Sequence, residues 1–122
     1  MEKTIASRKV VLVVEDEFLI REDTADILAS DGFEVMQAAA AEEALDLIVE
    51  RPEISVLFTD VNLPGMNGLA LARQVLNRWP HIRVLVTSGH INPKVDEIPG
   101  EFIGKPYMPE MVVATVRELA GA

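Results

Sequence analysis

Cysteine is absent from this chain of 122 residues, and its two histidines are isolated. Disulfides and thiolate metal sites are therefore excluded, and so is a histidine-rich zinc site. Any bound metal would be a hard, oxygen-bound cation. No apolar stretch reaches the roughly 18 residues of a membrane-spanning helix, and the N-terminus lacks a signal-peptide core. We therefore expect a soluble, cytoplasmic protein without membrane insertion.

Basic residues are scarce: 11 Lys and Arg stand against 20 Asp and Glu, which gives a formal net charge of −9. Nucleic-acid binding depends mostly on Lys and Arg that neutralise phosphates, so no nucleic-acid partner is expected. Proteins or cations are better candidates. The length and a hydrophobic content of 49% fit one compact domain with a proper core. We assign residues 1–7 to a tail and residues 8–121 to this domain.

Five short runs rich in β-branched residues are typical of strands buried on both faces. They lie at residues 9–14, 33–38, 54–59, 82–87 and, more weakly, 101–104. Segments with helical apolar spacing separate the strands and follow the last one, which predicts a parallel α/β sheet with helices on both faces. Between the last two strands, Pro93 and Pro99 bracket only five residues, so we expect a short or irregular fourth helix.

Polar side chains stand where four of these strands end, which is the edge at which such folds carry their functional groups. They are Glu15, Asp16, Glu17, Asp60, Thr87, Ser88 and Lys105, the last followed by Pro106. Each has an ordinary alternative: Asp16 as a helix cap, Asp60 as a turn residue, the hydroxyls as caps, and Lys105 as a solvated side chain. Their conjunction at successive strand ends favours a functional site.

Carboxylates within a few ångströms repel one another, so an apposed Glu15, Asp16 and Asp60 would be unfavourable unless a cation were bound. Mg²⁺ is the natural choice, because it takes such oxygens and keeps several waters. Asp60 stands alone at the mouth of a loop, which makes it the candidate nucleophile toward a phosphoryl group. Mg²⁺, Lys105 and the Thr87 hydroxyl would each hold one oxygen of that group.

The motifs "VVEDE", "FTDVNLPGMNG", "TSG" and "KPY" occur in this order and resemble the receiver domain of two-component response regulators, the CheY-like family. The resemblance covers residues 8–121 and implies a flavodoxin-like (βα)5 fold with strand order 2-1-3-4-5. It implies phosphoryl transfer from a histidine kinase or histidine phosphotransfer protein, and signalling through a downstream protein or onward transfer. We expect a stand-alone receiver that is not an enzyme beyond its own phosphorylation and dephosphorylation.

Carried over by position, the resemblance makes Asp60 the phosphoacceptor. Glu15, Asp16 and the backbone carbonyl of Asn62 would hold Mg²⁺ together with Asp60. Lys105 would contact the phosphoryl group.

The resemblance also implies a conformational switch, with Thr87 as its hydroxyl and Phe102 as its aromatic partner. Ser88 and Pro106 would support the site, and an X–Pro bond there is plausibly cis. Phe102 lacks the hydroxyl of the Tyr found in many relatives, and a static core or edge aromatic is the alternative. Thr87 and Lys105 are 18 positions apart, several fewer than in most family members, and the shortfall lies in the fourth helix.

Other functions remain as alternatives on this fold. A flavodoxin-like flavin binder would share the topology, but the acids at residues 15–17 would repel the phosphate of the flavin. A small phosphatase would need a second acid two residues after Asp60, where the chain has Asn62. A pseudo-receiver, which binds partners without being phosphorylated, would not need the full set of acids, hydroxyl and amine.

Overall fold

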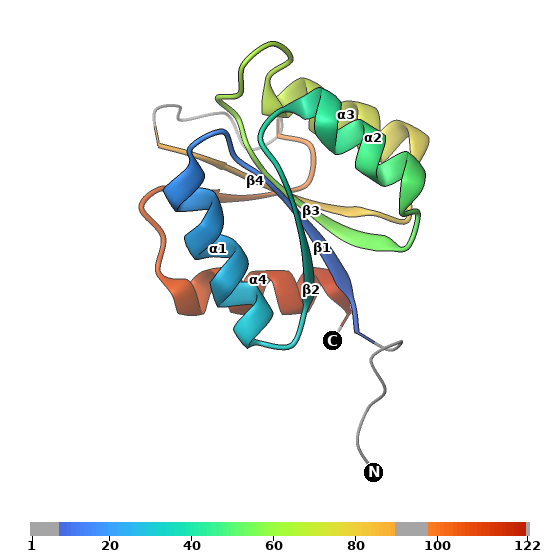
Figure 1. Ribbon diagram of the computed structural model, residues 1–122. Coiled ribbons are helices and arrows are strands. Elements are labelled where there is room, and N and C mark those ends of the chain that lie inside the picture. Colours follow the sequence, from blue (N-terminus) through green and yellow to red (C-terminus); the bar gives the residue numbers. More distant parts are fainter. Residues whose placement is uncertain (1–7, 90–97, 122) are drawn as a thin grey trace.

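The computed structural model describes residues 8–89 and 98–121, which form five strands and four helices (Figure 1). In chain order they are β1 (Val10–Val14), α1 (Phe18–Ser30), β2 (Glu34–Ala38), α2 (Ala41–Glu50), β3 (Ile54–Asp60), α3 (Gly68–Arg78), β4 (Arg83–Ser88), β5 (Glu101–Gly104) and α4 (Pro109–Ala120). The five predicted strands and the helices around them are confirmed. The short helix expected between β4 and β5 falls largely on residues 90–97, outside the described residues, and stays a prediction.

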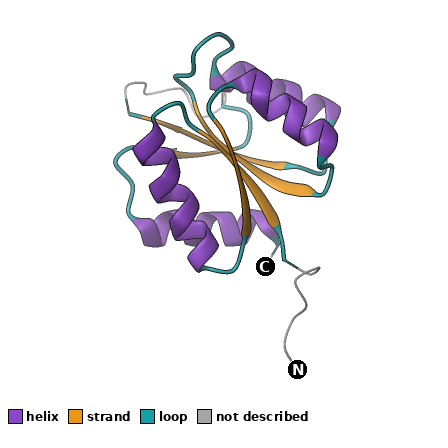
Figure 2. Cartoon of the chain, viewed as in Figure 1, coloured by secondary structure: helices purple, strands orange, loops and turns teal. Residues whose placement is uncertain are grey.

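All neighbouring strands are parallel, and the sheet has the order β2-β1-β3-β4-β5. The flavodoxin-like order implied by the resemblance is therefore confirmed. Helices α1 and α4 cover one face of the sheet, and α2 and α3 cover the other (Figure 2). None of the described helices is long and apolar enough to cross a membrane.

Two apolar cores lie on the two faces of the sheet, because successive side chains of a strand point to opposite sides. Leu12 and Leu57 pack with the residues of α2 and α3. Val11, Val56 and Leu85 pack with those of α1 and α4. This explains why the strands read as continuous apolar runs without polar alternation.

The strand register brings the predicted polar residues to one edge. Asp60 at the end of β3 pairs with Thr87 of β4, and the backbone N–H of Val61 donates to the Thr87 carbonyl at 2.9 Å. One strand further, the N–H of Lys105 donates to the carbonyl of Ser88 at 3.1 Å. The side chains that follow β3, β4 and β5 therefore start from neighbouring positions.

The loop from β3 to α3 folds back tightly on the end of β3. Asn67 caps α3, since its Oδ1 accepts from the N–H of Ala70 at 2.9 Å. A Cβ on the next residue, Gly68, would lie 1.8 Å from the carbonyl oxygen of Asp60. Only glycine allows this approach, so the loop geometry around Asp60 depends on Gly68.

Candidate functional site

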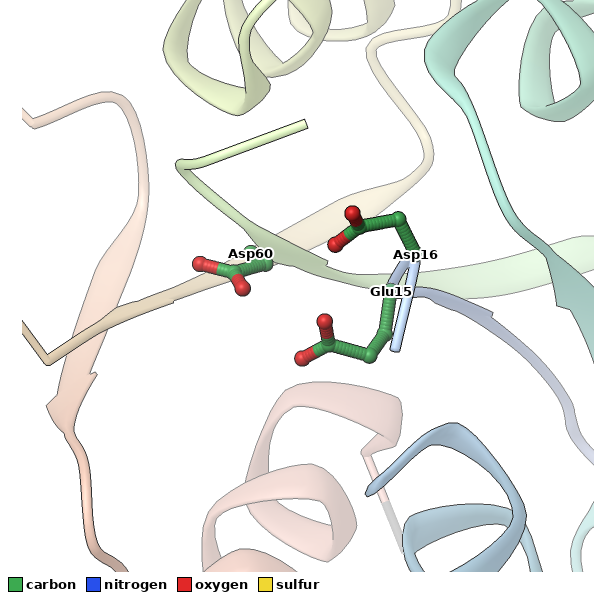
Figure 3. A group of neighbouring side chains, drawn as sticks. All are labelled: Glu15, Asp16 and Asp60. Carbon is green, nitrogen blue, oxygen red and sulfur yellow. The ribbon is translucent and has the colours of Figure 1, made fainter. Parts of the chain in front are cut away.

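Three carboxylates converge at the carboxyl edge of the sheet. Glu15 and Asp16 follow β1 and Asp60 ends β3, and Figure 3 shows their side chains turned toward a common space. One carboxylate oxygen from each lies within 4.8 Å of the others. Glu15 and Asp60 are buried, whereas Asp16 is exposed. Such a group is electrostatically unfavourable without a cation, as the sequence predicted.

Lys105 supplies a positive charge to this group. Its Nζ donates to Glu15 Oε1 at 2.8 Å and to Asp60 Oδ2 at 2.9 Å. Burial alone would lower the pKa of Lys105, but the hydrogen bonds to the two carboxylates outweigh it and raise the pKa to about 12. The alternative of a solvated surface lysine is therefore wrong, and Lys105 is a charged member of the site at any physiological pH.

The pKa of Glu15 is raised, whereas the pKa of an ordinary ion-paired acid is lowered. Burial raises the pKa of its carboxyl more than the hydrogen bonds from Lys105 and from the Glu17 backbone lower it, and the charge of Asp60 adds to the increase. The ammonium that Glu15 shares with Asp60 thus does not fully offset the burial of Glu15. The three carboxylates and Lys105 together keep a net negative charge, which a further cation would offset.

The loop that carries Glu15 and Asp16 is held by its own backbone and by α1. Glu15 Oε2 accepts from the N–H of Glu17 at 3.1 Å, and Arg21 Nη1 donates to the Glu15 carbonyl at 2.7 Å. The N-cap of α1 is Glu17, without a side-chain capping bond. Asp16 is therefore not a helix cap, which leaves its exposed carboxylate available to the site.

Asp60 combines a turn contact with a site contact. Its Oδ1 accepts from the N–H of Asn62 at 3.2 Å, a contact typical of Asp in turns, while Oδ2 accepts from Lys105. The two carboxylate oxygens of Asp60 thus have different contacts, one within the turn and one to Lys105 in the candidate site.

Thr87 lines a cavity together with two of these carboxylates. Its side chain is buried, and Oγ1 has no hydrogen-bond partner among the described residues. Thr87, Glu15 and Asp60 line a small cavity of about 10 Å³, roughly the space of one water-sized group. A buried hydroxyl without a partner is costly, so the alternative of an ordinary cap does not explain Thr87. Ser88 is also buried.

The acidic site opens into a pocket of about 360 Å³. It is lined by Glu15, Asp16, Glu17, Ile20, Asp60, Asn62, Gly89 and Lys105. Convergent carboxylate oxygens in a pocket with room for waters suit a hard divalent cation, so the donor set fits Mg²⁺. Glu15, Asp16 and Asp60 could hold it, and Asn62 lies at the same pocket.

Four of the predicted residues do not line this pocket: Thr87 lines the small cavity instead, Ser88 lines neither, and Pro106 and Phe102 lie elsewhere. Pro106, whose peptide bond with Lys105 is cis as expected, lines a neighbouring apolar groove. Phe102 lies on the edge strand β5 opposite Val86 and is 36% exposed. It lines neither the acidic pocket nor the small cavity. Its part in a switch stays a prediction.

Thr24 and Tyr107 also belong to the site, although the sequence did not single them out. Both line the cavity beneath Asp60, and their hydroxyl oxygens are 2.9 Å apart in a hydrogen bond. Tyr107 was visible only as the last letter of "KPY". Nothing in a sequence pairs it with a threonine 83 positions away.

This geometry agrees with the comparison to known families. The profile of the family described as "Response regulator receiver domain" matches residues 11–117. The chain therefore belongs to the response regulator receiver domain family, whose members accept phosphoryl groups in two-component signalling. The match does not support the flavin-binding alternative.

Individual relatives agree with the family. The hydrogenase transcriptional regulatory protein HoxA of Cupriavidus necator is 33% identical over 119 residues, 92% of this chain and 24% of the relative. The aerobic respiration control protein ArcA of Escherichia coli is 32% identical over 115 residues, 89% of this chain and 47% of the relative. The crystal structure of the receiver domain of NtrX from Brucella abortus has a TM-score of 0.83 at 30% identity, covering 92% of this chain and 98% of that chain. This chain thus spans less than half the length of these two curated relatives.

Proposed function

We propose that this receiver takes a phosphoryl group from a partner's phosphohistidine onto the carboxylate of Asp60, in a reaction that depends on Mg²⁺. The observation that carries the proposal is the convergence of three carboxylates and Lys105 on one pocket. A carboxylate oxygen of Asp60 attacks phosphorus, a P–O bond forms, and the P–N bond to the donor imidazole breaks. The imidazole leaves with the electron pair and takes up a proton from solvent.

The residues of this chain divide the work of positioning and charge neutralisation. Lys105 Nζ already lies 2.9 Å from Asp60 Oδ2, where it would contact an oxygen of the transferred group. The Thr87 hydroxyl has no partner among the described residues and would gain one by donating to another phosphoryl oxygen. When bound, Mg²⁺ would neutralise phosphoryl charge, held by Glu15, Asp16, Asp60 and the carbonyl of Asn62.

Thr87 would also couple the phosphorylation of Asp60 to a conformational change. Movement of its hydroxyl toward the phosphoryl group would vacate space near β5, which would shift a two-state equilibrium that includes Phe102. Phe102 is suited to packing changes, since it is partly exposed on an edge strand. The result would be altered contacts with a downstream protein, or onward transfer of the phosphoryl group. Apart from this self-phosphorylation and hydrolysis, we propose no enzymatic activity.

We propose that a phosphodonor docks at an apolar groove of about 560 Å³. It lies between α1 and the segment that begins α4, and it shares Ile20, Gly89 and Lys105 with the acidic pocket. Phe18 and Leu19, at the start of α1, are 58% and 73% exposed. A histidine kinase or histidine phosphotransfer protein seated there would bring its phosphohistidine to Asp60. We place this exchange in the cytoplasm, where receiver domains typically work.

Intact mass after incubation with acetyl phosphate and Mg²⁺ tests the proposal. The wild type should gain one phosphoryl group, and removal of Mg²⁺ with a chelator should prevent the gain. Asp60→Asn should stay unmodified, whereas Asp46→Asn, the same change on an α2 residue outside the pocket, should react like the wild type. Equal labelling of Asp60→Asn would refute Asp60 as acceptor. An unmodified wild type that also fails to bind a stable phosphoryl mimic would favour a pseudo-receiver.

A further inference from the structure

Tyr107 is a half-buried phenol that the proposed reaction does not use. It follows Lys105 by two residues, and its ring lies 5.8 Å from the ring of Phe58, centroid to centroid. Its hydroxyl makes a 2.9 Å hydrogen bond with Oγ1 of Thr24. Burial raises the pKa of Tyr107, so the phenol stays neutral, and either hydroxyl can donate in this hydrogen bond.

Thr24 is a firm anchor for that hydroxyl. Its side chain is buried in the middle of α1, the helix that starts directly after the acids Glu15 and Asp16. Figure 1 shows the segment between β5 and α4 passing beside α1. The Thr24–Tyr107 hydrogen bond therefore ties the segment that carries Lys105 to the helix that follows two of the carboxylates.

The stem of Lys105 passes over Gly89, where an added Cβ would lie 3.4 Å from Lys105 Cβ, so glycine offers no side chain to pack against it at that point. On the N-terminal side, the backbone N–H of Lys105 is held by the Ser88 carbonyl at 3.1 Å. On the C-terminal side, the nearest side-chain anchor that we find among the described residues is the hydroxyl of Tyr107.

We propose that Tyr107 and Thr24 form a positioning pair: their hydrogen bond fixes the Lys105 segment so that the ammonium stays over Glu15 and Asp60 during phosphoryl transfer. This inference rests on the proposed function of Asp60. A misplacement of about 1 Å can lower a rate by about a hundredfold, because the transition state requires each charge in place. Loss of one neutral hydrogen bond should slow the phosphorylation of Asp60 by about threefold to tenfold.

A double-mutant cycle on the phosphorylation rate tests the pair. Tyr107→Phe removes the phenol oxygen but keeps the ring on Phe58, and Thr24→Val removes the other hydroxyl at similar volume. We expect each variant to be slower with acetyl phosphate and Mg²⁺, and the double variant to be no slower than either single variant. Thr24→Ser, which retains a hydroxyl, should recover most of the rate. Thr115→Val on α4, away from the residues that line the cavity, should behave like the wild type.

Stability must be measured in parallel, because both residues are partly or fully buried. The folded fraction under assay conditions, taken from urea unfolding curves, corrects each rate. The inference is overturned if Tyr107→Phe matches the wild type, if the corrected rates are all equal, or if the effects of the single variants multiply in the double variant. In each case a phosphorylated wild type leaves the proposed function intact. A wild type that is never phosphorylated on Asp60 overturns both.

Discussion

Replacement of Lys105 by Met tests the electrostatic account of the site most directly. Met keeps an unbranched apolar side chain but removes the ammonium that Glu15 and Asp60 share. We expect the metal-free variant to be less stable than the wild type, because two buried carboxylates lose their positive partner. We also expect Mg²⁺ to bind the variant more tightly, since an internal cation no longer competes for the same carboxylates.

The magnitude follows from the protonation of Lys105. Its pKa rises from 10.5 to about 12, because the carboxylate hydrogen bonds outweigh the effect of burial. At about 1.4 kcal/mol per pKa unit, this corresponds to about 2 kcal/mol of stability. The side chain is 20% exposed, and screening by water lowers the expected value to about 1–2 kcal/mol. This stability is fully present below pH 10.5 and is lost as the pH rises through about 12.

Urea unfolding at neutral pH, with a chelator and then with Mg²⁺, measures both effects. The variant should lose about 1–2 kcal/mol in the chelator and recover most of it in Mg²⁺, because ligand binding stabilises the folded state in proportion to RT ln(1 + [L]/Kd). A tenfold lower Kd for Mg²⁺ would add about 1.4 kcal/mol at saturation.

Arg51→Met is a matched control, since Arg51 forms exposed ion pairs with Glu34 and Glu53 away from the site. Its cost should be smaller than that of Lys105→Met and should not depend on Mg²⁺. The reasoning is refuted if Lys105→Met is as stable as the wild type in the chelator, or if the variant binds Mg²⁺ more weakly.

Three further substitutions extend the test. Thr87→Val removes a buried hydroxyl without a partner among the described residues, so urea unfolding should show equal or higher stability, by up to about 1–3 kcal/mol. In this variant, phosphorylation should no longer change the affinity for a partner protein. A preserved change in that affinity would contradict the proposed switch. Gly68→Ala places a Cβ 1.8 Å from the Asp60 carbonyl oxygen and should cost about 3 kcal/mol or more in the same assay, whereas a loss below about 1 kcal/mol would show that the loop relaxes freely. Because the pKa of Glu15 is raised in the folded state, the metal-free protein should lose stability as the pH rises from 4.5 through the folded-state pKa. Glu15→Gln should therefore flatten the pH profile of stability in that range. An unchanged profile would contradict the effect of burial on Glu15.

The sequence was sufficient to locate the site because strand ends are easy to recognise. The apolar runs locate where β1, β3, β4 and β5 stop, and a parallel sheet brings those ends to one edge. Asp60 and Thr87 became register partners for this reason. The interpretation of Asp16 as a cap could not be decided beforehand, since an acid before a helix suits both roles. The structure separates the two, because the N-cap of α1 is Glu17 and not Asp16.

Contacts between distant segments were the part that could not be predicted. Lys105 was expected at the phosphoryl group, but its bridge between two carboxylates depends on side-chain rotamers that no local pattern encodes. The Thr24–Tyr107 hydrogen bond joins a helix to a loop near the other end of the chain, and no local pattern pairs the two residues, although Tyr107 is the only tyrosine of the sequence. Phe102 was predicted from the resemblance alone, and its part in a switch still needs a measurement in solution.

Phosphorylation would change the net charge of the group formed by Glu15, Asp16, Asp60 and Lys105. Three carboxylates and one ammonium carry a combined charge of minus two, which one divalent cation would offset. With such a cation bound, the group of Glu15, Asp16, Asp60 and Lys105 is neutral, and conversion of the Asp60 carboxylate to an acyl phosphate adds about one negative charge to it. The modified group would thus hold about one uncompensated charge next to the buried Thr87 hydroxyl. The conformational response would then begin with the attraction of the Thr87 hydroxyl to this one additional negative charge.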